Sequence, residues 1–317
     1  MSLSSQYDLN FEKAICYSGF RAGQSPEAKV YPTYEQVKED LLILSKQWTY
    51  LRMYDCDPHA ETVLNVIRDE NLNLKIMLGA YIEAEISNEL CPWDGGNYTE
   101  QQLDINKKSN LAKIHKLIEL ANNYSEIIHS LSAGNEACVD WTDHYVSPER
   151  IIEYVRMIKK GAKQPVTFCE NYVPWLDKLK ELVEEVDFIS IHTYPVWEYK
   201  GIHEAMHVTA DNYYSVANTY PDKKVVITEA GWTTNSNGRG IEPELVCEIR
   251  QETYLHDLLE WSENENILTF VFEAFDELWK GSEDPMEPEK HWGLFTIDRI
   301  PKKAMTTYYP KLIHETL

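Results

Sequence analysis

Residues 127–169 decide the fold, and they read IIHSLSAGNEACVDWTDHYVSPERIIEYVRMIKKGAKQPVTFC. The runs at 127–133 and 165–169 are rich in apolar and β-branched residues, which is typical of buried strands. Between them, Ser147 comes directly before a proline and is predicted to be a helix N-cap. Gly161 follows the last apolar residue of the helical pattern and is predicted to mark the end of the helix. The stretch therefore predicts a strand, a helix and a second strand.

The same alternation of short strand-like runs and longer helical stretches extends along the chain. Thr33 and Gln36, for example, form a capping box that opens a helical stretch. The strand candidates are 14–18, 48–54, 74–82, 127–133, 165–169, 187–194, 224–230 and 267–275. Because these runs are almost continuously apolar and helices separate them, we expect a parallel sheet buried on both faces. The loop at 17–21 lacks the glycine-rich fingerprint of a doubly wound sheet, so we predict an α/β fold, a single (β/α)8 TIM barrel spanning residues 1–317.

The composition narrows the class of protein. The 317 residues carry 30 Lys and Arg against 52 Asp and Glu, a formal net charge of −22, which disfavours nucleic acid as a partner. Six cysteines without a CxxC pair do not make a disulfide scaffold. The chain shows neither a signal peptide nor an apolar run long enough to span a membrane. We expect a soluble protein, cytoplasmic as written, or secreted or periplasmic if a leader was removed; the sequence makes no prediction of oligomeric state.

Two glutamates end predicted strands on opposite sides of the barrel. The fourth run ends in Asn135 and Glu136, and the seventh ends in Glu229, with a glycine close to each glutamate. Active sites of such barrels lie at the carboxyl ends of the strands, so both side chains should face one mouth. A single glutamate at a strand end is as readily a solvated loop residue or a partner for an arginine, but two placed in this way are harder to dismiss.

Paired carboxyl groups across a cleft suit cleavage of a glycosidic bond. The departing oxygen needs a proton, while the oxocarbenium-like centre needs an anion or a nucleophile on its other face. If the carboxyl groups lie about 5–5.5 Å apart, one can attack directly and the anomeric configuration is retained. These residues alone do not assign which glutamate plays which role.

Several longer motifs resemble one family. They are CYSGFRAGQSP at 16–26, SAGNEA at 132–137, VITEAGW at 226–232, FEAFDELWK at 272–280 and HWGLF at 291–295. Together they resemble glycoside hydrolase family 17, the β-1,3-glucanase family of clan A, in its bacterial and fungal branch. The resemblance covers nearly the whole chain. Plant members of the family have Thr-Gly-Trp-Pro where this chain has Ala230 to Thr233, so their subsite details are not transferred.

The resemblance implies an activity and a set of catalytic residues. It implies a retaining hydrolase that cleaves β-1,3-glucosidic bonds of laminarin-like β-glucan oligo- or polysaccharides through a covalent glucosyl-enzyme, without cofactor or metal. A β-1,3-glucanosyltransferase using the same site is the alternative. Glu136 matches the general acid/base and Glu229 the nucleophile. Asn135 would hydrogen-bond the 2-hydroxyl of the reacting sugar, and the Tyr194 phenol would help to keep Glu229 ionised.

The resemblance also implies further substrate-binding residues. Glu277 and Lys280 match residues of the eighth loop that contact substrate or the acid/base network, Tyr17 and Tyr54 would wall the subsites nearest the reacting sugar, and Trp232 and Trp292 would stack on sugar rings. The plain alternatives are that the two tyrosines are packed rim aromatics and that Lys280 pairs with Glu277 or Asp276. Glu170 and Glu273 are interpreted as secondary cleft or salt-bridge residues.

One motif competes with this interpretation. His203, Glu204 and His207 match the HExxH pattern, which on a helix can place two imidazoles on one face for a catalytic zinc ion. A zinc peptidase is therefore an alternative, although no third ligand motif follows and solvent-facing helix residues are the simpler interpretation. An inactive barrel that only binds glucan is a further alternative.

Overall fold

The computed structural model describes residues 8–93, 95–310 and 312. Within them, eight parallel strands pair in sequence order and close into a barrel in which β1 pairs with β8. The strands are β1 (Lys13–Cys16), β2 (Tyr50–Met53), β3 (Lys75–Gly79), β4 (Ile128–Asn135), β5 (Val166–Asn171), β6 (Ile189–His192), β7 (Val225–Ala230) and β8 (Thr269–Val271). The predicted (β/α)8 barrel is confirmed, while the ends of the predicted domain, 1–7 and 313–317, lie outside the described residues.

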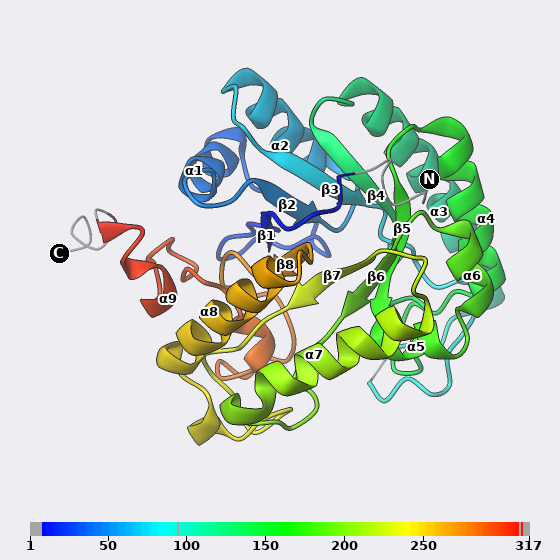
Figure 1. The fold of residues 1–317 in the computed structure, drawn as a ribbon. Helices are drawn as coiled ribbons and strands as arrows, with labels where there is room; N and C mark the ends of the chain where they lie inside the picture. The colour runs from blue at the N-terminus through cyan, green and yellow to red at the C-terminus, as the bar shows by residue number, and fades with distance from the viewer. Residues whose placement is uncertain (1–7, 94, 311, 313–317) are drawn as a thin grey trace.

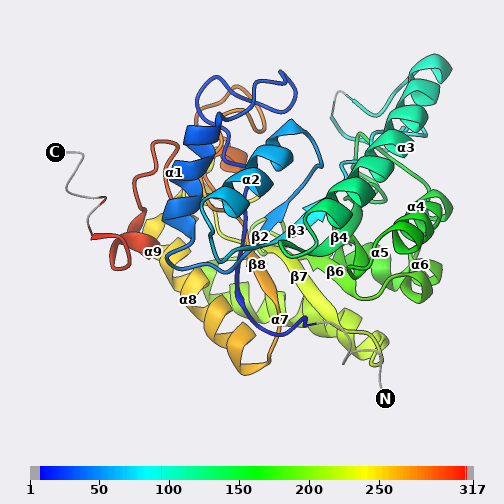
Figure 2. The ribbon, with the colours of Figure 1, turned by 90° about the horizontal axis from the view of Figure 1, so that it is seen from above.

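Helices surround the strands, as Figures 1 and 2 show from two directions. They are α1 (Tyr34–Leu44), α2 (Pro58–Asp69), α3 (Glu100–Asn123), α4 (Pro148–Gly161), α5 (Tyr172–Leu176), α6 (Lys180–Glu185), α7 (Ile202–Thr219), α8 (Glu248–Asn264) and α9 (Lys303–Thr306). The short 3-10 helices η2 (Pro243–Leu245) and η3 (Pro288–Lys290) lie in the loops after β7 and β8. Among the helices of the described residues, none has the length and apolar character needed to cross a membrane.

The helix signals found in the sequence act as predicted. The Thr33 hydroxyl accepts the Gln36 backbone N–H at 3.3 Å, and the Gln36 side chain accepts the Thr33 backbone N–H at 2.9 Å. The Ser147 hydroxyl accepts the Arg150 backbone N–H at 3.4 Å at the start of α4. Gly161 is the last residue of α4 rather than the first residue after it.

Pairing between neighbouring strands determines where each strand ends. β4 continues to Asn135, past the predicted end at residue 133, because Asn135 still pairs with Cys169 of β5. β8 is shorter than its predicted range because the register against β7 shifts between Ile227 and Ala230. As a result Glu136 directly follows β4, at the same end of the barrel as the carboxyl end of β7.

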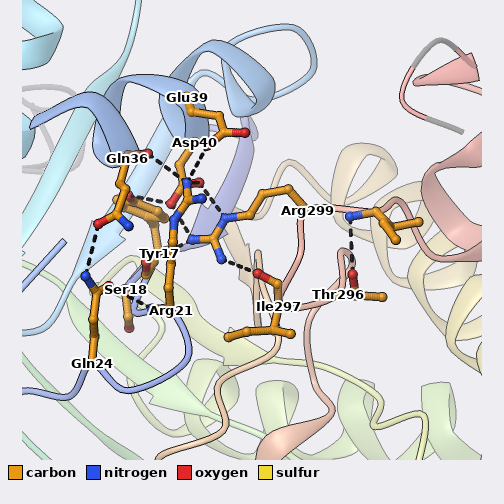
Figure 3. A network of polar contacts seen from close by, with 12 residues as sticks. Tyr17, Ser18, Arg21, Gln24, Gln36, Glu39, Asp40, Thr296, Ile297 and Arg299 are labelled. Carbon is orange, nitrogen blue, oxygen red and sulfur yellow. Dashed lines mark hydrogen bonds and ion pairs between the residues drawn. The ribbon is translucent and has the colours of Figure 1, made fainter. Parts of the chain in front are cut away.

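A buried polar network joins the first helix to the segment after β8 (Figure 3). The Arg299 guanidinium donates to both carboxylate oxygens of Asp40 in α1, each at 2.7 Å, and to the Gly19 carbonyl at 2.9 Å. Arg21 donates to Asp40 at 3.0 Å from the side that is nearer to solvent. Both Asp40 and Arg299 are buried, so the network links the first and last parts of the barrel next to the β1–β8 pairing.

Candidate active site

The barrel brings Glu136 and Glu229 together at the carboxyl ends of β4 and β7. One carboxylate oxygen of each glutamate and a ring nitrogen of His192 all lie within 4.8 Å of one another. The Glu229 side chain is buried, whereas the Glu136 side chain is 29% exposed. Two carboxyl groups at this separation fit the retaining geometry rather than the wider spacing of about 6.5–9.5 Å that leaves room for an attacking water.

Glu229 is held by donors from β2 and from the loop that follows β6. Arg52 of β2 donates to its Oε1 at 2.5 Å, and the Tyr194 hydroxyl donates to its Oε2 at 2.5 Å. Nδ1 of His192 lies 3.4 Å from Oε2. Burial opposes ionisation, but the charges of His192 and Arg52 and the Tyr194 hydrogen bond outweigh it and lower the pKa of Glu229 to about 2. Glu229 is thus a carboxylate at neutral pH, as a nucleophile must be.

His192 connects the two glutamates. Its Nδ1 lies 2.8 Å from Oε1 of Glu136, in addition to its contact with Glu229. Burial favours the neutral ring, yet the Glu229 charge and the influence of Cys169 and Glu136 together raise the pKa of His192 to about 10. The ring is therefore an imidazolium at neutral pH, with its N–H directed at the carboxylates. The sequence motif around Tyr194 contained this histidine, but its role depends on contacts that only the fold creates.

The same three side chains are close enough to hold a metal ion. Nδ1 of His192, however, already contacts the carboxylates of both glutamates. Both oxygens of Glu229 are moreover engaged by Arg52 and Tyr194. The arrangement therefore favours direct carboxylate chemistry over metal binding.

Arg52 was not identified from the sequence, although it organises the site. Its guanidinium bonds Glu229 and also donates to Oδ1 of Asn135 at 2.5 Å, while lying 4.3 Å from the centre of the Tyr54 ring. A lone charge inside the apolar run at 48–54 was the signal that could have marked it. Arg52 thus engages Oδ1 of Asn135, and the sugar contact that the family resemblance implies for Asn135 stays a prediction.

The predicted residues of the eighth loop form an ion cluster. Nζ of Lys280 lies 2.6 Å from a carboxylate oxygen of Glu273 and 2.6 Å from one of Glu277, and both glutamates are buried. Lys280 therefore pairs with Glu277, as the simpler interpretation held, but not with Asp276, which pairs with Lys302 at 2.7 Å. Glu273 is a salt-bridge residue as predicted.

Glu170 plays a different part. Its carboxyl group accepts the backbone N–H groups of Cys138 at 2.8 Å and Asn171 at 2.7 Å. Burial and the nearby Glu136 charge raise its pKa to about 8. Glu170 thus anchors the loop that carries Glu136 rather than forming a salt bridge.

Four aromatic residues were predicted to contact sugar. Only Tyr54 lies at the site, whereas Tyr17, Trp232 and Trp292 do not. Tyr54 is partly buried beside Arg52 at the site, and its hydroxyl is buried without a hydrogen-bond partner within the described residues, so its contact with a sugar stays a prediction. Tyr17 is buried with its hydroxyl 3.1 Å from Asp40, so its predicted place in a subsite wall is wrong (Figure 3).

The predicted stacking of Trp232 and Trp292 on sugar rings is also wrong. Both indoles are buried, because Trp232 packs on Tyr254 of α8 and Trp292 packs behind Tyr194, with ring centres 5.7 and 5.2 Å apart. Neither ring offers a free face, and Trp292 instead supports the tyrosine that bonds Glu229.

The HExxH motif lies on α7, away from the strand ends. His203, Glu204 and His207 are exposed, and His207 contacts Asp211 one turn later at 3.2 Å. They are solvent-facing helix residues, and a catalytic zinc at this position is not supported.

Comparison with known proteins identifies a family match over most of the chain. Residues 14–293 match the model of the BtgE/BtgC glycoside hydrolase domain. A glucan 1,3-beta-glucosidase of Arthroderma benhamiae is 23% identical over 212 residues, covering 62% of this chain and 67% of that protein. The btgC protein of Aspergillus niger is 25% identical over 298 residues, 86% of this chain, and this chain spans only 40% of its length.

Solved structures share the whole barrel. An endo-laminarinase from Formosa Hel1_33_131 superposes with a TM-score of 0.82 at 27% identity, covering 100% of this chain and 90% of that one. A β-1,3-glucanosyltransferase of Rhizomucor miehei, solved with laminaritriose, has a TM-score of 0.71 at 21% identity, covering 93% of this chain and 96% of that one. At that identity the second likeness shows the fold alone.

Proposed function

The chain belongs to the family of the BtgE/BtgC glycoside hydrolase domain, and we propose that it hydrolyses β-1,3-glucosidic bonds of laminarin-like β-glucans with retention of configuration. Support for the substrate comes from the endo-laminarinase that shares its fold and from the relative named a glucan 1,3-beta-glucosidase. On the motifs that resemble glycoside hydrolase family 17, we also propose that the chain is a member of that family, in the branch of the bacterial and fungal members.

In the first step Glu229 attacks the anomeric carbon. The glycosidic C–O bond breaks as Glu136 transfers a proton to the departing oxygen, and a glucosyl ester forms on Glu229. His192 engages Oε1 of Glu136, so the proton that is transferred resides on Oε2. Arg52 and Tyr194 hold the attacking carboxylate in position before and after the bond forms.

In the second step Glu136 acts as a base. It takes a proton from an incoming water, whose oxygen attacks the anomeric carbon and releases the Glu229 carboxylate. The two inversions restore the β configuration. Glu136 serves both steps because it is the more exposed of the two carboxyl groups and is reached by water.

The observation that carries the proposal is the short separation of the Glu136 and Glu229 oxygens, within 4.8 Å, at one mouth of a family barrel. A test uses Glu229→Ala and Glu136→Ala on an aryl β-laminaribioside with added azide. Without its nucleophile, the Glu229 variant should give an α-glycosyl azide by direct displacement. The Glu136 variant should give a β-glycosyl azide, because azide then attacks the glycosyl ester.

Glu83→Ala is the matched control, because Glu83 follows β3 at the same end of the barrel and pairs only loosely with Lys113, at 3.6 Å. This variant should keep wild-type turnover and give no azide product. Release of reducing ends by the wild-type protein separates an enzyme from a barrel that only binds glucan. Wild-type turnover by the Glu229 variant would overturn the proposal.

A further inference from the structure

Exposed tryptophans gather in the loops that follow β3 and β4. Trp93 is 50% exposed and Trp141 is 42% exposed, although an indole is costly to leave in water. The Trp93 Nε1–H donates to the Trp141 carbonyl at 2.9 Å, so the two loops are joined at this point. Trp141 lies in the same loop as Glu136, and the pair therefore extends outward from the acid/base side of the site.

Arg239, from the loop after β7, lies between two tryptophans. The carbon of its guanidinium group is 5.2 Å from the Trp93 ring centre and 4.9 Å from the Trp197 ring centre. We call Trp93, Arg239 and Trp197 the aromatic clasp. Glu287 neutralises the arginine, with Nη1 and Oε1 2.6 Å apart. The clasp thus combines aromatic rings with a neutralised charge, which suits a neutral sugar chain.

The clasp is closely packed and is connected to the nucleophile. At Gly240, which has φ of +77°, a Cβ atom would lie 2.2 Å from the Trp197 ring, so glycine permits the contact. Trp197 packs on Trp292 at 5.8 Å, and Trp292 packs on Tyr194 at 5.2 Å. The clasp therefore joins the loops of β3, β6 and β7, is bonded to Trp141 of the β4 loop, and reaches the tyrosine that bonds Glu229.

We propose that the aromatic clasp, with Trp141, binds the leaving-group part of the glucan, the glucose units beyond the scissile bond on the reducing-end side. The inference rests on the proposed function, in which Glu136 protonates the departing oxygen, so the leaving units lie on the Glu136 side. One face of Trp93 packs on Arg239, and its exposed surface is free to stack on the apolar face of a glucose ring.

The test compares two substrates that differ only on the leaving side. On laminarihexaose, Trp93→Ala should reduce kcat/KM by about tenfold, because an aromatic contact of this kind stabilises the bound chain. On 4-nitrophenyl β-laminaribioside, which carries no glucose unit on the leaving side, release of nitrophenol should stay within about twofold of wild type. Gly240→Ala should reproduce this pattern by displacing Trp197, although residue 240 contributes no side chain for binding.

Tyr199→Asn is the matched control. Tyr199 is an exposed aromatic residue on the same face, outside the clasp, and its φ of +57° is one that asparagine adopts readily. It should leave kcat/KM unchanged on both substrates. Equal losses for Trp93→Ala on both substrates, or no loss on either, would overturn the inference. Failure of the wild-type protein to release nitrophenol would instead refute the proposed function.

Discussion

Glu229 owes its ionised state to neighbours that surround a buried carboxyl group. Burial alone would favour the protonated acid, but Arg52 and Tyr194 donate to its oxygens and the His192 imidazolium lies 3.4 Å away. Burial and the Glu229 charge raise the pKa of Tyr194 well above its usual value, so the tyrosine remains a donor. The ionised state of Glu229 therefore depends on contacts between β7 and residues of β2, β6 and the loop after β6.

Replacing His192 should shift the acid limb of the pH profile of kcat/KM. His192→Asn removes a positive charge facing Glu229, so the pKa of Glu229 should rise from about 2 and the acid limb of kcat/KM should move to higher pH. A shift of about one unit would correspond to roughly 1.4 kcal/mol of lost carboxylate stabilisation. The exposed His256→Asn is the control and should leave the limb in place. An unmoved limb in His192→Asn would contradict the electrostatic role of the imidazolium.

The same shifts predict how folding stability depends on pH. The pKa of Glu229 is lowered from 4.5 to about 2, so its stabilising contribution is present above about pH 4.5 and is lost as the pH falls toward 2. The pKa of His192 is raised from 6.5 to about 10, so its contribution is present below about pH 6.5 and is lost as the pH rises toward 10. In urea titrations, the unfolding free energy of Glu229→Gln should fall less steeply than that of wild type as the pH is lowered. An equally steep loss in the variant would refute the assignment.

Glu136 should matter most when the leaving group is poor. Glu136→Gln should lower kcat/KM on laminari-oligosaccharides by about 10²- to 10⁴-fold, the usual contribution of general acid catalysis. On dinitrophenyl β-glucoside, which departs without protonation, bond cleavage should lose much less, as a burst of dinitrophenol in stopped-flow absorbance would show. Losses of equal size on both substrates would remove the acid role.

The sequence allowed prediction of residues with a fixed place relative to a strand end, but not of residues whose roles depend on distant partners. Glu136, Glu229 and Tyr194 followed from motifs at strand ends. Arg52 was missed because the residues it bonds, Asn135 and Glu229, are remote in the chain. Local sequence also does not show which side of a loop faces the core, which explains the error at Tyr17 and at the two buried tryptophans.

At the scale of elements, sequence signals predicted helix starts correctly, because a helix cap depends only on residues that are neighbours in the chain. The capping box at Thr33 and the N-cap at Ser147 formed as predicted, since both depend on neighbouring backbone groups. Strand ends were less predictable, because pairing with the adjacent strand sets them. The register shift between β7 and β8, for example, has no signal within the run at 267–275.

Loss of the first helix cap should be measurable. Thr33→Ala leaves the Gln36 backbone N–H at the start of α1 without its side-chain acceptor, and it should cost about 1 kcal/mol of unfolding free energy. Urea titration followed by circular dichroism gives this value. Thr62→Ala, in the exposed part of α2, removes a hydroxyl that bonds only within its own helix and should cost nothing comparable. Equal effects at the two sites would argue against the cap.

At the scale of the molecule, the Asp40 and Arg299 network joins α1 to the chain after β8 beside the β1–β8 pairing (Figure 3). Arg299→Met should lower the unfolding free energy by about 3–5 kcal/mol, because it leaves the Asp40 charge buried without its main partner. Arg156→Met, which breaks an exposed ion pair with Glu185, should leave the unfolding midpoint unchanged. If thermal unfolding of the two variants is the same, the network does not stabilise the barrel.

The whole account depends on covalent capture of a sugar by Glu229. The most direct measurement is mass spectrometry of peptides after incubation with 2-deoxy-2-fluoro-β-laminaribiosyl fluoride, whose fluorines favour formation of the glycosyl ester and slow its hydrolysis. The account predicts a single added fluorolaminaribiosyl group on the peptide that contains Glu229. A label on a peptide that lacks Glu229 would contradict it.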